Sequence, residues 1–329
     1  MARRHELPDP RWSEPIGAAW PTTPRRFWSD DPSRLYSTSM NADETPAVFV
    51  TGATGSVGAA AVASLVEKGV RVVAAVRDAS ATGALPAGAE HRVFEFSADP
   101  EAMRRALEGC DRLFLMRPPP IEDVEQFLFP LIDAAMAMGI RQIVFLSLQG
   151  VEHNKGVPHY RVEKYLEQIG APFTFLRPNF FMQNLSTTYR DDIRDRDEIF
   201  LPAGHAFTAF IDARDIGAVA AAVLTSPGHI RKKYTLNGEQ SLTYRNVGRI
   251  LSDILGRPIR YARPSEKEYL ARLTAEGYPK DYIDVQRMIY RVVRWNISAF
   301  PNRAVRKLTG RPAATFRQFA ERERTAWER

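Results

Sequence analysis

Short runs of consecutive apolar residues alternate with longer amphipathic stretches through the first half of the chain. Consecutive apolar residues are typical of strands buried on both faces of a parallel sheet, and the amphipathic stretches are typical of helices that cover those faces. The pattern therefore predicts an α/β fold with a doubly wound parallel sheet. The predicted strands are 47–50, 70–76, 92–96, 113–116, 143–146 and 173–176.

Local residues mark the ends of several predicted helices. Gly69 follows the apolar positions of the first helix, and glycine readily adopts the left-handed conformation in which many helices end. Asp99 and Pro100 predict the start of a second helix, because aspartate caps helix N-termini and proline suits the first helical position. Asp212 and Asp215 are expected to cap a later helix in the same way.

The regular alternation weakens in the second half of the chain. A charged run at 190–198 predicts a solvated helix or loop, 210–224 predicts a short strand and a helix, and 234–236 predicts another strand. We therefore expect a first domain at 46–185. A mixed region at 186–329 is expected to complete the sheet and to form a smaller, mostly helical C-terminal lobe.

Residues 1–45 differ from the rest of the chain because they are rich in proline and polar residues, with aromatic residues at no regular spacing. This composition predicts an irregular or disordered extension. Met40 stands shortly before the first strand. One hypothesis is that the native protein starts there and lacks residues 1–39, which the intact mass of natively expressed protein would test.

The composition is that of an ordinary globular enzyme, with 44% hydrophobic and 26% charged residues. The net charge of +6 suits an anionic ligand, and the absence of a dense Lys/Arg run argues against direct nucleic-acid binding. The single cysteine, Cys110, excludes an intrachain disulfide and a cysteine-based zinc site, and the six histidines show no paired metal-binding spacing. No apolar stretch predicts a membrane span or a signal peptide, so we expect a cytoplasmic protein.

The strongest motif is the glycine pattern G-x-x-G-x-x-G between the first strand and the first helix. It allows a tight turn, close approach of a pyrophosphate to the backbone and close packing of the helix on the strand. The helix N-terminus then offers its N–H groups to the phosphates. The motif predicts a Rossmann-type domain that binds a nicotinamide dinucleotide, with the following candidate residues: Gly52, Thr54, Gly55, Ser56, Val57 and Gly58.

The ends of the later strands supply further candidates for the cofactor site. Arg77 ends the second strand, where a guanidinium can pair with the 2′-phosphate of NADP; this placement favours NADP(H), with NAD(H) the alternative. Arg77 could equally be a surface charge. Met116 and Arg117 end the fourth strand and are expected to line the cofactor, and Ser147 and Gln149 follow the fifth, where ligands of α/β proteins bind.

Several motifs together resemble the extended and atypical short-chain dehydrogenases, and more narrowly the NmrA-like family. The resemblance covers roughly residues 46–329. Its motifs are 48–58, Leu146-Ser147, His159-x-x-x-Glu163, 175–184 (FLRPNFFMQN), 210–216 (FIDARDI), 255–259 (LGRPI), 309–312 (TGRP) and 315–319 (TFRQF).

Tyr160 and Lys164 match the Tyr-x-x-x-Lys signature, in which a tyrosine protonates a carbonyl and a lysine lowers its pKa. The family resemblance argues against this pair. Alignment on the glutamate that follows the family's lysine puts His159 in the lysine position and Lys155 in the tyrosine position, so Tyr160 is five residues out of register. Five residues turn a helix by about 500°, or roughly 140° away.

The catalytic candidates are therefore His159, Tyr160 and Lys155. Pro158 suggests that the helix starts there, which leaves Lys155 outside it. His159 could donate a proton or contact the cofactor, or it could be a structural histidine. The missing dyad makes this chain an atypical member.

The resemblance also implies that the turn containing Asn179 and Phe180 lies beside the nicotinamide. Phe181 and Met182, with Phe180, would form an apolar wall for a flat substrate, and Gln149 would join that pocket. Core packing is the alternative role for these apolar residues.

Two functions fit these observations. The first is an NADPH-dependent oxidoreductase that transfers a hydride to a small hydrophobic, aromatic or quinone-like substrate, a reaction that requires orientation more than acid catalysis. The second is a non-enzymatic dinucleotide sensor that acts through a protein partner, because the NmrA-like family includes such sensors. Neither function involves a membrane or direct contact with nucleic acid.

Overall fold

The structure is a computed structural model that describes residues 47–78 and 85–329. The predicted extension at 1–45 and the hypothesis about Met40 concern residues outside these ranges. None of the helices in the described residues has the length and apolar character needed to cross a bilayer.

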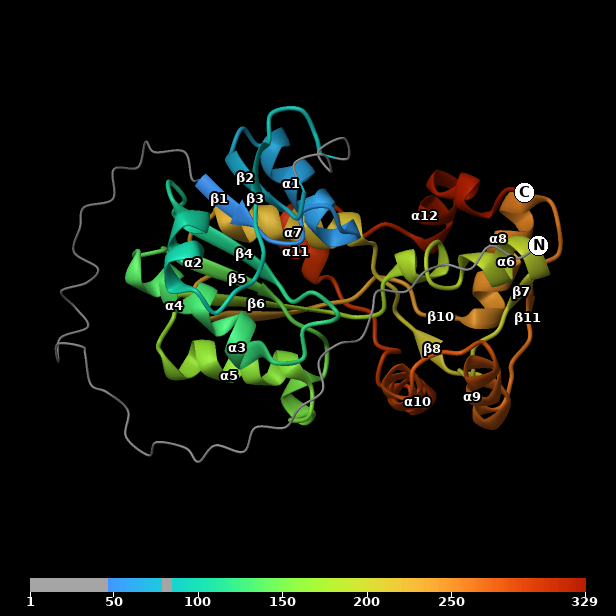
Figure 1. Cartoon of the computed structure of the whole chain (residues 1–329). Helices are drawn as coiled ribbons and strands as arrows, with labels where there is room; N and C mark the ends of the chain where they lie inside the picture. The colour runs from blue at the N-terminus through green and yellow to red at the C-terminus, as the bar shows by residue number, and fades with distance from the viewer. Residues whose placement is uncertain (1–46, 79–84) are drawn as a thin grey trace. The chain divides into compact units, whose positions relative to one another are not determined.

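Seven parallel strands form the central sheet in the order β3-β2-β1-β4-β5-β6-β9 (Figure 1). Because strand order reverses between β1 and β4, their carboxyl ends border the crevice in which α/β proteins bind ligands. The predicted Rossmann-type sheet is confirmed. The strands are β1 (Ala47–Val50), β2 (Arg71–Val76), β3 (Glu90–Val93), β4 (Arg112–Met116), β5 (Gln142–Leu146), β6 (Phe173–Pro178) and β9 (Lys232–Leu236).

The third strand differs from the prediction of 92–96, because β3 ends at Val93. Beyond the strand, the Phe94 amide still donates to the Val76 carbonyl at 2.9 Å, and the Phe94 ring packs edge to face with the rings of Phe49 and Phe96. The ring centroid of Phe94 lies 5.3 Å from that of Phe49 and 4.9 Å from that of Phe96. The apolar residues at 94 and 96 therefore reflect aromatic packing and not a longer strand.

Helices cover both faces of the sheet because alternate residues of each strand point to opposite sides. One face packs against α1 (Ser56–Glu67), α7 (Ala213–Thr225) and α11 (Ala304–Thr309). Gly217 lets α7 approach α1 closely, since a Cβ there would lie 2.5 Å from the carbonyl carbon of Ala60. The other face packs against α2 (Pro100–Leu107), α3 (Val124–Phe127), α4 (Phe129–Ala137) and α5 (Pro158–Gln168).

The predicted end of the first helix and the predicted start of the second are confirmed. Gly69 has φ +71° and follows α1 directly after its C-cap. Asp99 caps α2 by accepting a hydrogen bond from the Glu101 amide at 3.0 Å. The charged run forms α6 (Arg190–Arg196), a solvated helix with one buried residue, Ile193.

The second half contributes α7, α11 and β9 to the layers around the large sheet, and its remainder forms a mostly helical lobe. The lobe has its own core, in which Trp327 is fully buried and the Tyr290 hydroxyl donates to that of Tyr189 at 2.7 Å. Its elements are η4 (Met182–Leu185), α6, β7 (Glu198–Ile199), β8 (Phe207–Thr208), β10 (Leu242–Thr243), α8 (Tyr244–Leu255), β11 (Arg260–Tyr261), α9 (Glu266–Ala275), α10 (Lys280–Arg294), α12 (Phe316–Arg322) and η5 (Arg324–Trp327).

The start of α9 is joined to α10 by ion pairs of Glu266. Its carboxylate pairs with Arg291 at 2.9 Å and also with Arg294. These hydrogen bonds lower the pKa of Glu266 to about 2. The two helices therefore share a charge-assisted contact that persists over most of the accessible pH range.

We predict that Glu266→Gln lowers the free energy of unfolding by about 1 kcal/mol at pH 7. Because the folded-state pKa is lowered, the stabilisation is present above pH 4.5 and is lost as the pH falls toward 2. Urea unfolding at pH 7, 5 and 4 should show the deficit shrinking at the lowest pH. Glu321→Gln, at an exposed position on α12, is the control; a deficit independent of pH would contradict this account.

Candidate functional site

The glycine turn places the start of α1 at the carboxyl end of β1. Gly52 has φ +59°, and its carbonyl accepts a hydrogen bond from the Gly55 amide at 2.9 Å. Gly55 is the N-cap of α1, no side chain caps this end, and no acidic residue occupies the first turn. The first N–H groups of α1 therefore remain available to an anion, as a pyrophosphate site requires.

The turn is compact because Gly58 has no side chain. A Cβ at Gly58 would lie 2.1 Å from the Gly52 oxygen and 2.8 Å from Cε of Met116. Thr51 fixes the neighbouring strand end, because its hydroxyl oxygen accepts a hydrogen bond from the Met116 amide at 2.8 Å. The ends of β1 and β4 and the start of α1 are thus held together around one backbone turn.

Arg77 and Arg117 follow the ends of β2 and β4 in different environments. Arg77 is exposed, and no hydrogen bond or ion pair joins it to the part of the chain that the structure describes. The Arg117 guanidinium donates to the carbonyls of Pro118 at 3.0 Å and Pro119 at 2.9 Å, and burial lowers its pKa. Arg117 therefore organises the loop after β4, whereas the guanidinium N–H groups of Arg77 make no hydrogen bond to the described residues.

The loop after β5 carries two polar groups with unused bonding capacity. Ser147 is 4% exposed, and its hydroxyl has no hydrogen-bond partner among the described residues. Gln149 donates from Nε2 to the carbonyl of Ile297 at 3.3 Å, while its buried Oε1 has no such partner. Both groups lie next to the carboxyl end of a central strand, where they could meet a ligand.

An ion pair fixes α5 against β6 and thereby positions the catalytic candidates. Arg177 binds the buried Glu163 through two hydrogen bonds, of 2.9 and 2.5 Å, and also pairs with Glu152 at 3.1 Å. The helix begins at Pro158, as predicted, and Lys155 lies outside it at an exposed position.

His159 is held in the neutral form. Its ring packs 5.9 Å from that of Phe145, and Nδ1 is buried without a hydrogen-bond partner among the described residues. Burial, assisted by the charge of Arg117, lowers the pKa of His159 to about 3. A neutral imidazole is a poor acid at pH 7, which restricts His159 to contact or positioning.

The Tyr160 and Lys164 side chains do not form an isolated pair. The Lys164 ammonium lies 5.7 Å from the Tyr160 ring centre, and it donates to Glu167 at 2.7 Å. That hydrogen bond is the main cause of the raised pKa of Lys164. The lysine is therefore already engaged on the outer surface of α5.

Asn179 directly follows β6, and its side-chain amide makes its hydrogen bonds inside the protein. Its Nδ2 donates to the carbonyls of Ala209 at 3.0 Å and Ser298 at 2.9 Å, and its Oδ1 accepts from the Phe180 amide at 2.9 Å. The side chain shapes the turn; the predicted contact with a cofactor stays a prediction.

The apolar candidates after Asn179 separate into different environments. Phe180 is partly buried against the lobe core, and Phe181 is partly buried against the core of the α1 face. Met182 is 2% exposed and belongs to the lobe core. Met182 therefore has the core-packing role, whereas the predicted contacts of Phe180 and Phe181 with a substrate stay predictions.

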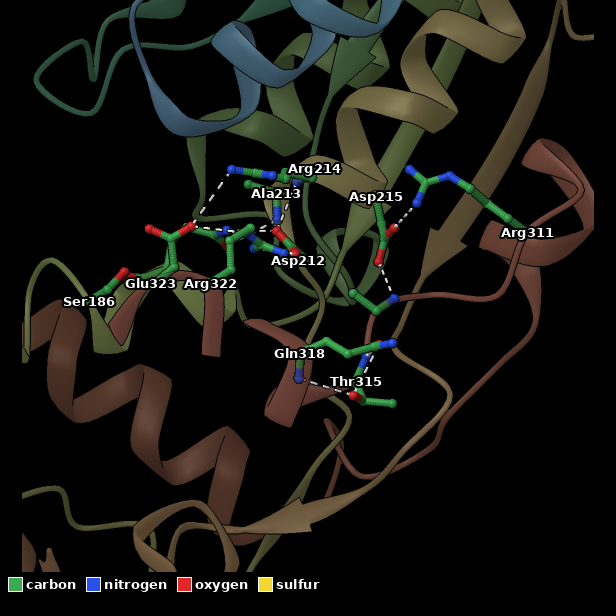
Figure 2. A network of polar contacts seen from close by, with 12 residues as sticks. Ser186, Asp212, Ala213, Arg214, Asp215, Arg311, Thr315, Gln318, Arg322 and Glu323 are labelled. Atoms are coloured by element: carbon green, nitrogen blue, oxygen red, sulfur yellow. Dashed lines mark hydrogen bonds and ion pairs between the residues drawn. The ribbon is translucent and has the colours of Figure 1, made fainter. Parts of the chain in front are cut away.

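A buried polar network binds the segment that follows the Asn179–Phe180 turn, through Gln183 (Figure 2). Asp212 is fully buried, caps α7 at the Arg214 amide, and accepts hydrogen bonds from Gln183 and Arg322, each at 2.7 Å. Figure 2 shows Asp215 directed instead toward the C-terminal segment, where it accepts from the Ala314 amide at 2.7 Å. The expected capping role is confirmed for Asp212 and is wrong for Asp215.

A loop that sequence analysis missed crosses the strand ends. Residues 296–300, called the crossing loop below, present successive backbone carbonyls to side-chain donors. Gln149 and Asn179 bind the first two of these carbonyls, as described above. Asn237, directly after β9, donates to the Phe300 carbonyl at 2.6 Å. The only sequence signal is a run without charges, Trp295 to Pro301, after the charged helix α10.

No group of three or more metal-ligating side chains occurs in the described ranges. The geometry consists of a parallel sheet, an uncapped helix N-terminus on a glycine turn, and polar groups at neighbouring strand ends. Together they define a Rossmann-type dinucleotide-binding protein. The chain belongs to the NmrA-like family, whose model matches residues 44–308.

Several proteins that this chain resembles are reductases by name. The NAD(P)H azoreductase of Xenophilus azovorans is 33% identical over 284 residues, which cover 85% of this chain and 99% of that protein. The NADPH-dependent quinone oxidoreductase of Escherichia coli, solved in complex with NADPH, is 25% identical with a TM-score of 0.75, covering 84% of this chain and 99% of that one. Citrobacter triphenylmethane reductase shares the fold at 22% identity and a TM-score of 0.72, with 84% and 99% covered.

We predict that Gly58→Ala weakens binding of a nicotinamide dinucleotide at least about tenfold, because the new methyl group would displace α1 from the Gly52 carbonyl. Calorimetric titration measures the affinity, and circular dichroism checks the fold. Ala59→Ser is the matched control, since Ala59 lines an open groove along α1. Unchanged affinity in the folded Gly58→Ala variant would contradict the packing argument.

We predict that the His159 imidazole shows no titration between pH 5 and 8, because its pKa of about 3 keeps it neutral throughout. The histidine resonances followed by NMR measure this, with His159→Gln assigning the signal and free imidazole as the reference. A His159 inflection near pH 6–7 would restore this residue as a candidate acid.

Proposed function

We propose that this chain is an NAD(P)H-dependent oxidoreductase that acts on aromatic, quinone-like substrates. The observation that carries the proposal is the uncapped N-terminus of α1 on the glycine turn, at the point where strand order reverses. The substrate class follows the names of the relatives, an azoreductase and a quinone oxidoreductase, both matched over almost their whole length.

The residues present fit a dinucleotide. The backbone N–H groups of Ser56, Val57 and Gly58, presented by the turn that Gly52, Thr54 and Gly55 form, would hold the pyrophosphate. Met116 would cover this turn, to which its methyl group already lies close. Ser147, with its free hydroxyl, and the backbone of the Asn179–Phe180 turn would border the nicotinamide. Residues 46–185 would thus carry the cofactor, and 186–329 would complete the sheet and cover the substrate.

Arg77 supports a preference for NADPH over NADH. It follows β2 directly, it is exposed, and its donors remain free of the described chain. A guanidinium in this position can bind a 2′-phosphate through two parallel hydrogen bonds, whereas a 2′-hydroxyl offers no charge.

The protein's own contribution to the reaction is orientation. The bound cofactor supplies a hydride, and a quinone that accepts it needs one further proton to become a hydroquinone. His159 is neutral and Lys164 is bound to Glu167, so neither provides a cationic acid beside the strand ends. Solvent can protonate the reduced oxygen of a quinone, which suits a site without the Tyr/Lys dyad.

We predict that Arg77→Ala weakens NADPH binding about tenfold or more and leaves NADH binding within about twofold, because only NADPH carries the 2′-phosphate. Calorimetry with both nucleotides measures the ratio. Arg104→Ala removes an exposed arginine on α2 and serves as the control. Equal losses for both nucleotides would show that Arg77 does not select the phosphate.

Turnover of a quinone and azo-dye panel, followed by loss of reduced-nicotinamide absorbance, tests the reaction itself. Reduction of any member supports the oxidoreductase. Tight nucleotide binding without turnover of the panel would instead support the dinucleotide sensor that acts through a protein partner.

A further inference from the structure

The crossing loop is fastened at four consecutive carbonyls by side chains that do not belong to it. The donors are Gln149 to Ile297 at 3.3 Å, Asn179 to Ser298 at 2.9 Å, Ser241 to Ala299 at 2.6 Å and Asn237 to Phe300 at 2.6 Å. Three of these donors follow the carboxyl ends of β5, β6 and β9. The loop therefore lies across the edge of the sheet where ligands of this fold bind.

Two apolar side chains of the loop face outward, whereas Ser298 is buried. Phe300 is 70% exposed and Ile297 is 44% exposed, although the backbone between them is fixed. Exposed apolar side chains on a monomer normally occur singly. Two of them within four residues of one fixed loop are therefore unusual.

Helix α10, which leads into the crossing loop, carries further exposed apolar side chains. Val285 and Met288 are three residues apart and so lie on one helix face, and Trp295, the C-cap residue, is 73% exposed. The Asn154 side chain lies 3.4 Å from Sδ of Met288. This contact joins α10 to the segment between β5 and α5, which also contains Ser147 and Gln149.

We propose that Met288, Trp295 and Ile297 form the outer wall of the substrate site and select acceptors with two or more aromatic rings. This inference rests on the proposed reductase function. The reacting ring would lie at the strand ends, beside the cofactor. A single ring reaches only that position, whereas a larger planar molecule extends onto the wall and covers its apolar surface.

The charge distribution at the wall supports this occupant. No charged residue lies between Trp295 and Phe300, and Arg291, between Met288 and Trp295, is paired with Glu266 at 2.9 Å. Trp295 supplies a large flat face that stacks on planar rings. The wall is also continuous with the proposed cofactor site through Gln149, which contacts the crossing loop and retains a free Oε1.

The test compares 1,4-benzoquinone, with one ring, and 9,10-phenanthrenequinone, with three. For Trp295→Ala and Met288→Ala, we expect kcat/KM for phenanthrenequinone to fall about tenfold, mainly through KM. Benzoquinone reduction and NADPH affinity should stay within about twofold. Trp295→Phe should retain most of the selectivity. The matched control is Ile230→Ala, which truncates another apolar side chain, 48% exposed, before β9.

Equal losses of kcat/KM for the two quinones, or no loss for either, would overturn the proposal. A second measurement covers the case in which the wild type reduces neither quinone, which would count against the proposed function. Calorimetric binding of anthraquinone-2-sulfonate to the NADP⁺-loaded protein then tests the wall without turnover. Loss of this binding in Trp295→Ala supports the proposal, and unchanged binding overturns it. A wild-type dimer that Trp295→Ala converts to a monomer would identify the surface as a contact between copies and would also overturn the proposal.

Discussion

The close approach of α1 to the Gly52 carbonyl is the constraint on which the rest of the site depends. Only a residue without a side chain can stand at position 58, because any Cβ would overlap that oxygen at 2.1 Å. The contact fixes where α1 starts, and with it the direction of its first N–H groups. Because Gly217 then allows α7 to lie against α1, the same helix also sets the position of the second half of the chain.

A second level of order comes from polar groups that join distant parts of the chain. Asp212 links the start of α7 to Gln183 after β6 and to Arg322 near the C-terminus. The Glu163–Arg177 pair fixes α5 on β6. These buried groups have little capacity left to bind a ligand, because their hydrogen bonds are already made inside the protein. Their effect is to hold the strand ends in one arrangement. The reactive surface is left to backbone amides and a few unpaired side chains.

Local signals in the sequence were sufficient to predict most of the first domain. Continuous apolar runs identified the strands, and the glycines, Asp99 and Pro158 identified turns and helix starts, because each acts on its own neighbours. The end of β3 was misplaced because Phe94 is apolar for aromatic packing, a reason that periodicity does not distinguish from a strand.

Features set by distant residues could not be predicted. Asn179 has partners at residues 209 and 298, and Asp215 caps no helix because its partner is Ala314. The neutral state of His159 arises from burial, which a sequence does not display. The crossing loop has no motif, since its backbone carbonyls make the contacts and every residue has a carbonyl.

The way in which the crossing loop is fastened affects how such a protein can diverge. Because the crossing loop is held mainly through its main chain, by uncharged amides and a hydroxyl from other segments, the exposed side chains of Ile297 and Phe300 are not required for its position. Replacement of Ile297 or Phe300 would change the chemistry of the surface and leave the frame intact. Architecture and selectivity are thereby encoded by different residues. Substitutions at the exposed positions of the loop can therefore change the substrate preference without destabilising the fold.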